Sequence, residues 1–391
     1  MAKQKINIGL IGSGFMGRAH SFAWSNVSKF MDTDFEPVLK VMTYGSKKEA
    51  AEEFAEKWGW EELAKDWKEI VARDDIDIID IVTPTYLHKE IAIAAAKAGK
   101  HIYCEKPCAI SYADCLEMEK AVTEAGVVHY LNHNYRRVPA IEFAKKLIEE
   151  GKIGRIYHWR GAYLQDWILD PNFPLTWQFR KDMAGGGPLY DLGSHSVDLA
   201  RYLVGEVKTV MAKNYTFTPE RPLPGKEAVV FRAGSNNATE TGKVEVDDAS
   251  FMVVEFENGA LGSFDVTRMA GGRKNYNHFE IYGSKGCLSW NFESMNELRF
   301  LNLEDPAGEQ GYRTISATLG GHGQAGVWWG PGHVIGYENT FIHAAADFLK
   351  AVKDGSVITP NFTDGAKIIR VLEAAARSSE ENRQVLVSEI A

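Results

Sequence analysis

The stretch KINIGLIGSGFMGRAH, residues 5–20, decides the fold of the first part of the chain. A short apolar run ends in a glycine. Three glycines, Gly12, Gly14 and Gly17, then follow the spacing G-x-G-x-x-G, and a helical pattern begins directly afterwards. Gly12 permits a tight turn, Gly14 lets a pyrophosphate approach the backbone, and Gly17 lets the helix pack close to the strand. Because a helix N-terminus also favours an anion, we predict a dinucleotide-binding loop here.

Outward from this loop, strand-like and helix-like segments alternate up to about residue 135, which indicates βαβ units and a parallel sheet. Beyond that point most segments look like long strands separated by glycine-containing turns, and helical patterns return at 187–204 and after Gly336. We predict an α/β protein with a doubly wound parallel Rossmann sheet in residues 1–133. Residues 134–391 should form a second domain with a large, mostly antiparallel sheet.

Composition limits the classes of function. The 391 residues suffice for two domains, and 45% apolar with 25% charged residues is normal for a globular protein. The net charge of −9 and the lack of a long basic run argue against a nucleic-acid partner. The N-terminal stretch has no apolar segment with a cleavage site, and no segment is long enough to span a membrane, so we expect a cytoplasmic protein.

The four cysteines fit neither a zinc site nor a disulfide framework, and we expect no metal. They are Cys104, Cys108, Cys115 and Cys287.

The end of the second predicted strand bears on the choice between NAD and NADP. An acidic side chain there would bind the ribose 2′-hydroxyl group, but this chain has VMTYGSKKE. The hydroxyl group of Ser46 and the two lysines Lys47 and Lys48 can accommodate a 2′-phosphate, or both lysines can be solvated residues of the following helix. We therefore expect NAD or NADP as cofactor.

Two further short stretches carry chemistry. In HIYCEKP, residues 101–107, proline stops a strand and holds Lys106 at a fixed elbow, as suits a lysine that must reach a reacting oxygen. After a glycine-rich turn, Asp191 and His195 lie four residues apart on a predicted helix. A neighbouring carboxylate raises the pKa of an imidazole, which suits a general base, although the same spacing is met in an ordinary hydrogen bond along a helix.

Two glycine- and proline-containing segments, 218–243 and 319–336, should be loops. The second contains Trp328 and Trp329, and is either a surface loop pinned by an apolar anchor or a lid over a pocket.

Together these motifs resemble the Gfo/Idh/MocA oxidoreductases. The resemblance runs in order along essentially the whole chain, through the glycine loop, VTPTYLH (82–88), CEKP (104–107), NYRRVPA (134–140) and AGGGPLYDLGSHSVDLARYLVG (184–205). It implies a C-terminal domain that binds substrate and joins copies of the chain into dimers or tetramers. It also implies that Lys106, Asp191 and His195 are catalytic, and that the Lys106–Pro107 bond is a candidate for the cis isomer.

The same resemblance implies the binding residues. Those for the cofactor are Gly12, Gly14, Phe15, Met16, Gly17, Ser46, Lys47, Thr83, Pro84, His88, Glu105 and Lys106. Those for the substrate are Lys106, Tyr135, Arg136, Gln165, Asp166, Trp167, Asp191, His195 and Tyr337. The stretches YLQDW (163–167) and GYENTFIHAAADF (336–348) are most similar to the levoglucosan dehydrogenase-like subgroup, which oxidises the 3-hydroxyl group of pyranosides.

We therefore expect a dehydrogenase that moves a hydride from a secondary hydroxyl group of a sugar, glycoside or anhydrosugar to a nicotinamide. An inositol (cyclitol) dehydrogenase is the first alternative. A second is cleavage of a glycoside through a keto sugar, with the cofactor recycled. A third, from another class, is a nucleotide-sensing protein without turnover, against which the acid–base residues argue.

Overall fold

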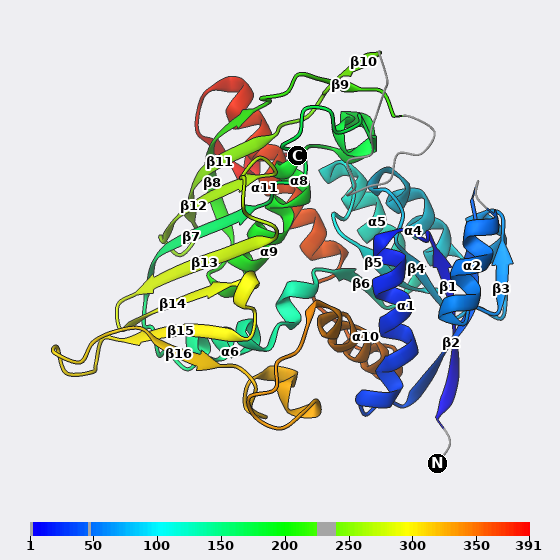
Figure 1. Cartoon of the computed structure of the whole chain (residues 1–391), viewed down its shortest axis with the longest axis horizontal. Coiled ribbons are helices and arrows are strands. Elements are labelled where there is room, and N and C mark those ends of the chain that lie inside the picture. The colour runs from blue at the N-terminus through cyan, green and yellow to red at the C-terminus, as the bar shows by residue number, and fades with distance from the viewer. Residues whose placement is uncertain (1–2, 46–47, 225–239) are drawn as a thin grey trace. The chain divides into compact units, whose positions relative to one another are not determined.

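The computed structural model describes residues 3–45, 48–224 and 240–391, which form two compact units (Figure 1). The first unit is built from Met1–Ala109, Ala113–Arg137 and Gln324–Ala366, and the second from Ile110–Tyr112, Val138–Gly323 and Lys367–Ala391. The predicted boundary after residue 133 assigns 324–366 to the second domain, whereas the contacts of this segment place it in the first unit.

The first unit contains the predicted parallel sheet, with six strands in the order β3-β2-β1-β4-β5-β6. The strands are β1 (Gln4–Ile11), β2 (Phe35–Thr43), β3 (Glu62–Ala64), β4 (Ile78–Ile81), β5 (His101–Glu105) and β6 (His129–Asn132). The helices are α1 (Phe15–Phe30), α2 (Lys48–Trp58), α3 (Trp67–Val71), η1 (Thr85–Leu87), α4 (His88–Lys97), α5 (Tyr112–Ala125), η2 (Asn134–Arg137), η5 (Gly323–Val327) and α10 (Tyr337–Asp354). The order reverses between β1 and β4, and sheets of this type bind ligands at the carboxyl ends of the strands there.

Helix α10 completes the core of the first unit although it lies some two hundred residues further along the chain. Its buried Phe348 packs edge-on against Trp24 of α1 and Tyr103 of β5, with ring centroids 6.4 and 5.3 Å apart. Phe341 and Leu349 are buried in the same cluster. The apolar face of α1 is therefore covered by α10, which explains why residues 324–366 belong to this unit.

The second unit contains a nine-stranded sheet in the order β16-β15-β14-β13-β7-β12-β11-β8-β17. Its strands are β7 (Ile156–Leu164), β8 (Val207–Tyr215), β11 (Ala249–Phe256), β12 (Leu261–Thr267), β13 (Tyr276–Gly283), β14 (Gly286–Asn291), β15 (Glu297–Asn302), β16 (Arg313–Ser316) and β17 (Val385–Leu386). All neighbouring strands are antiparallel except β7 and β12, so the prediction of a mostly antiparallel sheet is confirmed. A separate pair, β9 (Glu220–Pro222) and β10 (Thr241–Lys243), lies in the predicted 218–243 loop.

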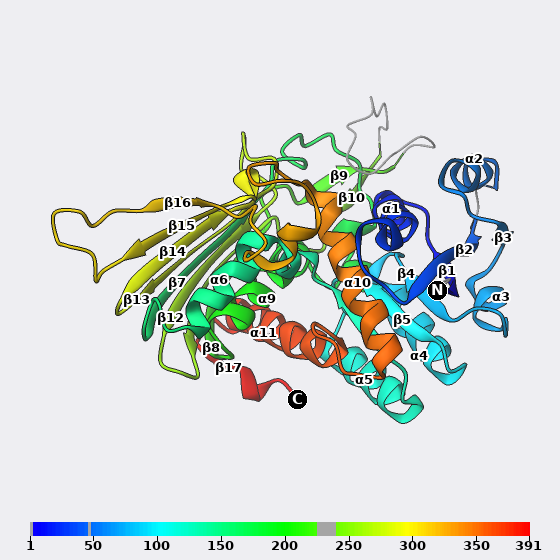
Figure 2. The same cartoon turned by 90° about the horizontal axis from the view of Figure 1, so that it is seen from below.

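The longer helices of this unit cover one face of the large sheet (Figure 2). The helices are α6 (Pro139–Glu149), α7 (Lys181–Ala184), α8 (Pro188–Asp191), α9 (Gly193–Leu203) and α11 (Phe362–Glu381), with short turns η3 (Trp177–Phe179), η4 (Phe292–Ser294) and η6 (Val387–Glu389). Helix α6 was not among the predicted helices, although Pro139 stands in its first turn and Ile141, Ala144 and Leu147 form its buried stripe.

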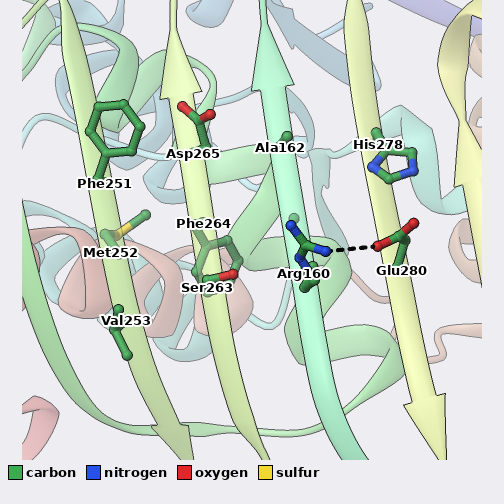
Figure 3. Close-up of a pocket in the computed structure, with 11 residues that line it drawn as sticks. Arg160, Ala162, Phe251, Met252, Val253, Ser263, Phe264, Asp265, His278 and Glu280 are labelled. Atoms are coloured by element: carbon green, nitrogen blue, oxygen red, sulfur yellow. Dashed lines mark ion pairs between the residues drawn. The ribbon is translucent and has the colours of Figure 1, made fainter.

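The opposite face of the sheet exposes apolar side chains. Met211, Phe251, Val253 and Leu261 are each more than half exposed, because strand residues point to alternate faces. A hollow of about 360 Å³ lies across four of these strands, where Arg160 and Glu280 form an ion pair with 3.6 Å between nitrogen and oxygen (Figure 3). An exposed apolar face of this kind is typical of a protein–protein contact surface.

The described parts of the chain contain neither a candidate membrane span nor a candidate metal cluster. No helix there is long and apolar enough to cross a membrane. No group of three or more His, Cys, Asp or Glu side chains in those ranges has a geometry that would hold a metal ion.

Candidate functional site

The glycine loop between β1 and α1 has a different steric reason for each glycine. Gly12 has a φ of +110°, and a Cβ atom there would lie 2.7 Å from the carbonyl oxygen of Val82. A Cβ on Gly17 would lie 3.1 Å from the Gly12 carbonyl oxygen, whereas a Cβ on Gly14 would meet no atom of the described residues within 4 Å. Space beside Gly14, at a helix start without an acidic residue or a side-chain cap, fits the approach of a pyrophosphate.

Thr43 at the end of β2 supports this loop rather than a ribose. Its Oγ1 accepts a hydrogen bond of 3.0 Å from the backbone N–H of Gly12. No acidic side chain stands at the described strand end, which continues with Tyr44 and Gly45. The predicted 2′-phosphate residues Ser46 and Lys47 lie outside the described residues.

The VTPTYLH segment lies after β4, beside the switch point of the sheet. The hydroxyl group of Thr83 is buried and has no hydrogen-bond partner among the described residues, as fits a group that awaits a ligand. Pro84 precedes the short helix η1. Buried His88 instead links two segments of the protein, since its Nδ1 lies 2.9 Å from the Pro107 carbonyl oxygen and its Nε2 3.0 Å from that of Thr83.

Lys106 lies at the carboxyl end of β5, at the predicted elbow. The Lys106–Pro107 bond is cis, as expected, and Lys106 is half-buried. Both flanks of the elbow are held, because Glu105 Oε2 accepts a 3.2 Å hydrogen bond from the Lys106 backbone N–H while His88 holds the Pro107 carbonyl. The geometry fixes the backbone from which the lysine side chain projects.

Five further predicted residues of the first unit lie in its aromatic, ionic and apolar packing. Tyr337, at the start of α10, has its ring 6.4 Å from that of Phe15 in the glycine loop and 6.4 Å from that of buried Tyr135. Buried Arg136 forms an ion pair with Asp364, at 3.6 Å between nitrogen and oxygen. Tyr337 and Phe15 thus lie side by side at the dinucleotide loop, and Arg136 has a structural partner. Met16 is partly buried against the core of the unit.

In the second unit, helices α8 and α9 carry the predicted acid–base residues. They are consecutive helices that meet at Leu192, whose φ of −92° and ψ of −41° keep the backbone helical. Half-buried Asp247 holds the start of α8 by accepting hydrogen bonds of 2.8 Å from the N–H groups of Gly187 and Leu189. Gly187 cannot carry a side chain, because a Cβ there would lie only 1.9 Å from the Asp247 carbonyl oxygen.

Asp191 has an arginine partner that the sequence did not reveal. Arg268, after β12, is only 2% exposed and donates a 2.7 Å hydrogen bond to Asp191 Oδ2. Its guanidinium lies 5.0 Å above the ring of Trp167. His195 is buried, with its ring 5.9 Å from that of Tyr163. The expected effect of Asp191 on the pKa of His195 stays a prediction.

A chain of hydrogen bonds connects the predicted substrate residues that follow β7. Trp167 Nε1 donates to Gln165 Oε1 at 2.8 Å, and Gln165 Nε2 donates to Asn275 Oδ1 at 2.8 Å. Tyr163 donates to the same Asn275 oxygen at 2.7 Å. This set of aromatic rings and directed amide and hydroxyl groups suits a pyranose, which has apolar C–H faces and polar edges.

Asp166 is engaged differently from its neighbours. Its Oδ2 lies 2.8 Å from the ammonium nitrogen of Lys274 and accepts a 3.1 Å hydrogen bond from the Gly272 N–H. The hydrogen bond from Lys274 lowers the pKa of Asp166, so its carboxylate is anionic near neutral pH. Asp166 therefore fastens the 270–275 loop, which carries Asn275 to Gln165.

Sequence reasoning missed Arg268, Asn275 and Lys274. Each lies about 80 to 110 residues along the chain from its partner and shows no local spacing signal. Their only trace in the sequence is a polar or basic residue in the loop between β12 and β13, which is common in loops.

The glycine-rich loop 319–336 is pinned by one of its two tryptophans. Trp328 packs on Phe30 of α1, with ring centroids 4.7 Å apart, and donates a 2.7 Å hydrogen bond to Nε2 of buried His343 in α10. Trp329 is 57% exposed. These contacts favour the surface loop with an apolar anchor over the lid.

Comparison with known families gives matches over most of the chain. A family described as an oxidoreductase family with an NAD-binding Rossmann fold (GFO_IDH_MocA) matches residues 6–133. The GFO/IDH/MocA C-terminal domain matches residues 141–289.

Individual relatives match the full length. A levoglucosan dehydrogenase of Pseudarthrobacter phenanthrenivorans is 43% identical over 388 residues, 99% of either chain. A myo-inositol 2-dehydrogenase of Thermotoga maritima is 27% identical, over 98% of this chain and 99% of its own. A solved levoglucosan dehydrogenase in complex with NADH and levoglucosan is similar with a TM-score of 0.91 and 43% identity, over 98% of this chain and 99% of its own.

Proposed function

Because this chain belongs to the Gfo/Idh/MocA family of oxidoreductases, with an NAD-binding Rossmann domain, we propose that it oxidises the 3-hydroxyl group of a pyranose such as levoglucosan. The observation that carries the substrate class is the joined set Trp167–Gln165–Asn275–Tyr163, which combines aromatic faces with directed polar groups. The 43% identity to a levoglucosan dehydrogenase supports the particular sugar.

The proposed reaction needs three side chains of this protein. NAD, when bound, accepts the hydride from the carbinol carbon. His195 takes the hydroxyl proton as general base, and Lys106 donates a hydrogen bond to the same oxygen as negative charge develops on it. Asp191, fixed by Arg268, orients His195 or binds a neighbouring hydroxyl group.

The cofactor would be held by the first unit. The tight turn at Gly12 and the open space beside Gly14 would let the pyrophosphate reach the start of α1, and the buried hydroxyl of Thr83 is available to hydrogen-bond to it. Phe15 and Tyr337 lie beside that loop.

The deciding experiment follows absorbance at 340 nm with NAD and NADP separately, and identifies the product by NMR. The panel contains levoglucosan, methyl glucoside and myo-inositol. Reduction with levoglucosan and a ketone at C3 is expected. Turnover of myo-inositol alone would make the protein a cyclitol dehydrogenase, and cleavage of the glucoside without net NADH would indicate a recycled cofactor. Binding of NADH without any turnover of the panel would contradict the proposal.

We also propose that copies of this chain associate through the open face of the nine-stranded sheet. Its exposed apolar side chains Met211, Phe251, Val253 and Leu261 support this, since soluble monomers seldom expose such a surface.

A further inference from the structure

A cluster of buried charged side chains lies inside the first unit, next to the backbone of Lys106. The proposed hydride and proton transfers do not use these side chains. His20, on the helix that opens at the glycine loop, is 1% exposed and lies between two carboxylates. Its Nδ1 is 2.8 Å from Asp80 Oδ1, and its Nε2 is 2.9 Å from Glu105 Oε1. Asp80 comes from β4 and Glu105 from β5, so the cluster joins α1 to two neighbouring strands of the parallel sheet.

The partners of His20 identify its charge state. A neutral imidazole has a single N–H and can donate to only one carboxylate, whereas an imidazolium donates to both. Asn132 Nδ2 is 2.6 Å from Glu105 Oε1 but 3.2 Å from His20 Nε2, so the carboxylate takes the amide proton. Asp80 Oδ2 also accepts a 2.7 Å hydrogen bond from the indole N–H of Trp24. Both carboxylates are therefore held by donors, and His20 is a cation between them.

The cluster ends at the catalytic elbow. Oε1 of Glu105 accepts hydrogen bonds from His20 and Asn132. Its other oxygen, Oε2, accepts a 3.2 Å hydrogen bond from the backbone N–H of Lys106. A carboxylate fixed on one oxygen by an imidazolium thus fixes the following backbone amide with the other. Replacing a buried ionic cluster by apolar residues often leaves the free energy of unfolding unchanged, which suggests that this cluster does more than stabilise the fold.

On the basis of the proposed function, we propose that His20 is a positioning residue that keeps Glu105 ionised and thereby holds Lys106 in its reacting position. The histidine acts through Glu105 and touches neither substrate nor the reacting oxygen. This role of His20 and Glu105 is separate from the roles of the glycine motif and of the Lys106 side chain in the proposed reaction.

The ionisable groups around His20 and Glu105 are Asp80, Tyr103, Cys104, His88 and Lys106. Burial disfavours the cation of His20, but Asp80 and Glu105 together raise its pKa to about 10. Burial opposes ionisation of Glu105 too, yet His20 brings the net pKa of Glu105 below its usual value. Burial raises the pKa of Tyr103 and of Cys104 well above the usual values and lowers that of His88, so all three stay neutral between about pH 7 and 9. The ammonium of Lys106 is the remaining charge acting on Glu105.

The first test reads the charge of His20 in the unaltered protein. A long-range ¹H–¹⁵N spectrum of histidine-labelled protein at pH 8.5 should show one ring with both nitrogens protonated, and that signal should vanish in His20→Gln. A spectrum with only neutral rings at this pH would overturn the proposal. Because no turnover is involved, this result does not depend on the identity of the sugar, and a failed dehydrogenase assay would count only against the proposed function.

The second test is kinetic. In His20→Gln the pKa of Glu105 should rise, so the acid limb of the profile of kcat/KM against pH should move to higher pH by about one unit or more. We expect kcat to fall by about tenfold or more through misplacement of Lys106, while the Kd of NADH stays near that of the wild type. Adding Glu105→Gln should remove the shifted limb, because the carboxyl group that accepts from the Lys106 backbone N–H is then gone while Asp80 remains.

His343→Gln is the matched control, because His343 is equally buried in the same unit but bonds to Trp328 and the Arg137 carbonyl. A shift of the acid limb in this control as large as in His20→Gln, or an unchanged profile and kcat in His20→Gln, would overturn the proposal. If His20→Gln does not fold, the single variant Glu105→Gln tests the positioning role instead. This variant must lose kcat, and full activity in it would overturn the positioning role.

Discussion

Lys106 is the side chain on which the proposed reaction depends most directly. Lys106→Ala should lower kcat by about 10²- to 10³-fold, because the developing alkoxide loses a charged donor, while NADH binding changes little. Stopped-flow turnover and a fluorescence titration with NADH separate the two effects. Lys89→Ala, which removes a surface lysine paired with Asp114 and Glu117, is the control and should keep wild-type kcat. Normal turnover in Lys106→Ala would remove this lysine from the mechanism.

Arg268 should affect catalysis although its side chain is buried and bonds to Asp191. Arg268→Met keeps most of the side-chain volume but removes the charge that holds the Asp191 carboxylate and the cation above Trp167. We expect kcat/KM to fall by about ten- to a hundredfold. Arg299→Met, which removes an arginine stacked on Tyr312 at 4.8 Å, is the comparison and should leave kcat/KM within about twofold. Equal values for the two variants would show that Arg268 only packs.

These two residues also mark how far sequence reasoning reaches at this scale. Lys106 could be predicted because Pro107 and the preceding strand specify a local elbow. Arg268 could not, because it meets Asp191 only when β12 and α8 are folded, and the two positions lie 77 residues apart. Local spacing predicts groups on one element, whereas partners from different elements depend on tertiary packing.

The β1–α1 element allows a test that separates folding from cofactor binding. Gly12→Ala places a Cβ 2.7 Å from the Val82 carbonyl at a φ of +110°, and should destabilise the protein by about 1–3 kcal/mol. Gly14→Ala meets no described atom within 4 Å, so its Tm should be unchanged, but NADH should bind about tenfold or more weakly. Thermal unfolding and NADH titration measure both variants. Tight NADH binding by Gly14→Ala would contradict the placement of the pyrophosphate.

The contact between α10 and the loop before it should weaken in acid. Burial lowers the pKa of His343 to about 4, against 6.5 when unfolded. The neutral ring accepts from Trp328, so its contribution to stability is complete above pH 6.5 and is lost as pH falls from 6.5 towards 4, by at most about 3 kcal/mol. Glutamine can reproduce both hydrogen bonds without titrating. The Tm of His343→Gln should therefore fall less between pH 7 and 5 than that of the wild type, and parallel curves would refute this account.

At the scale of elements, the sequence predicts the longer strands and helices of the first unit because each has its own periodicity and its own stop, such as Gly59 after α2. The three-residue strand β3 and the five-residue helix α3 carry no such signal. Helix α6 escaped prediction because it lies where the pattern changes from alternating units to strands. Residues 324–366 were assigned to the wrong partner for a related reason. The apolar stripe of α10 shows that the helix is buried but carries no information about which sheet buries it.

For the whole molecule, the open sheet face yields a prediction about assembly. Val253→Asp places a charge in the middle of the exposed apolar surface and should convert the oligomer to a monomer, because an interface does not bury an unpaired carboxylate readily. Light scattering after size-exclusion chromatography measures the mass. Val357→Asp, at an even more exposed position in the first unit, should leave the mass unchanged. A monomeric wild-type protein would refute the association outright.

The late position of α10 has a consequence for the newly made chain. Residues 1–137 leave the ribosome first, but Trp24 and Tyr103 remain uncovered until residues 337–354 have been synthesised. At ordinary rates of translation this delay is roughly 10 to 40 seconds. During that interval the nascent first unit leaves these apolar side chains uncovered, which favours binding by chaperones, and a stop codon near residue 320 would yield a product that never closes its core.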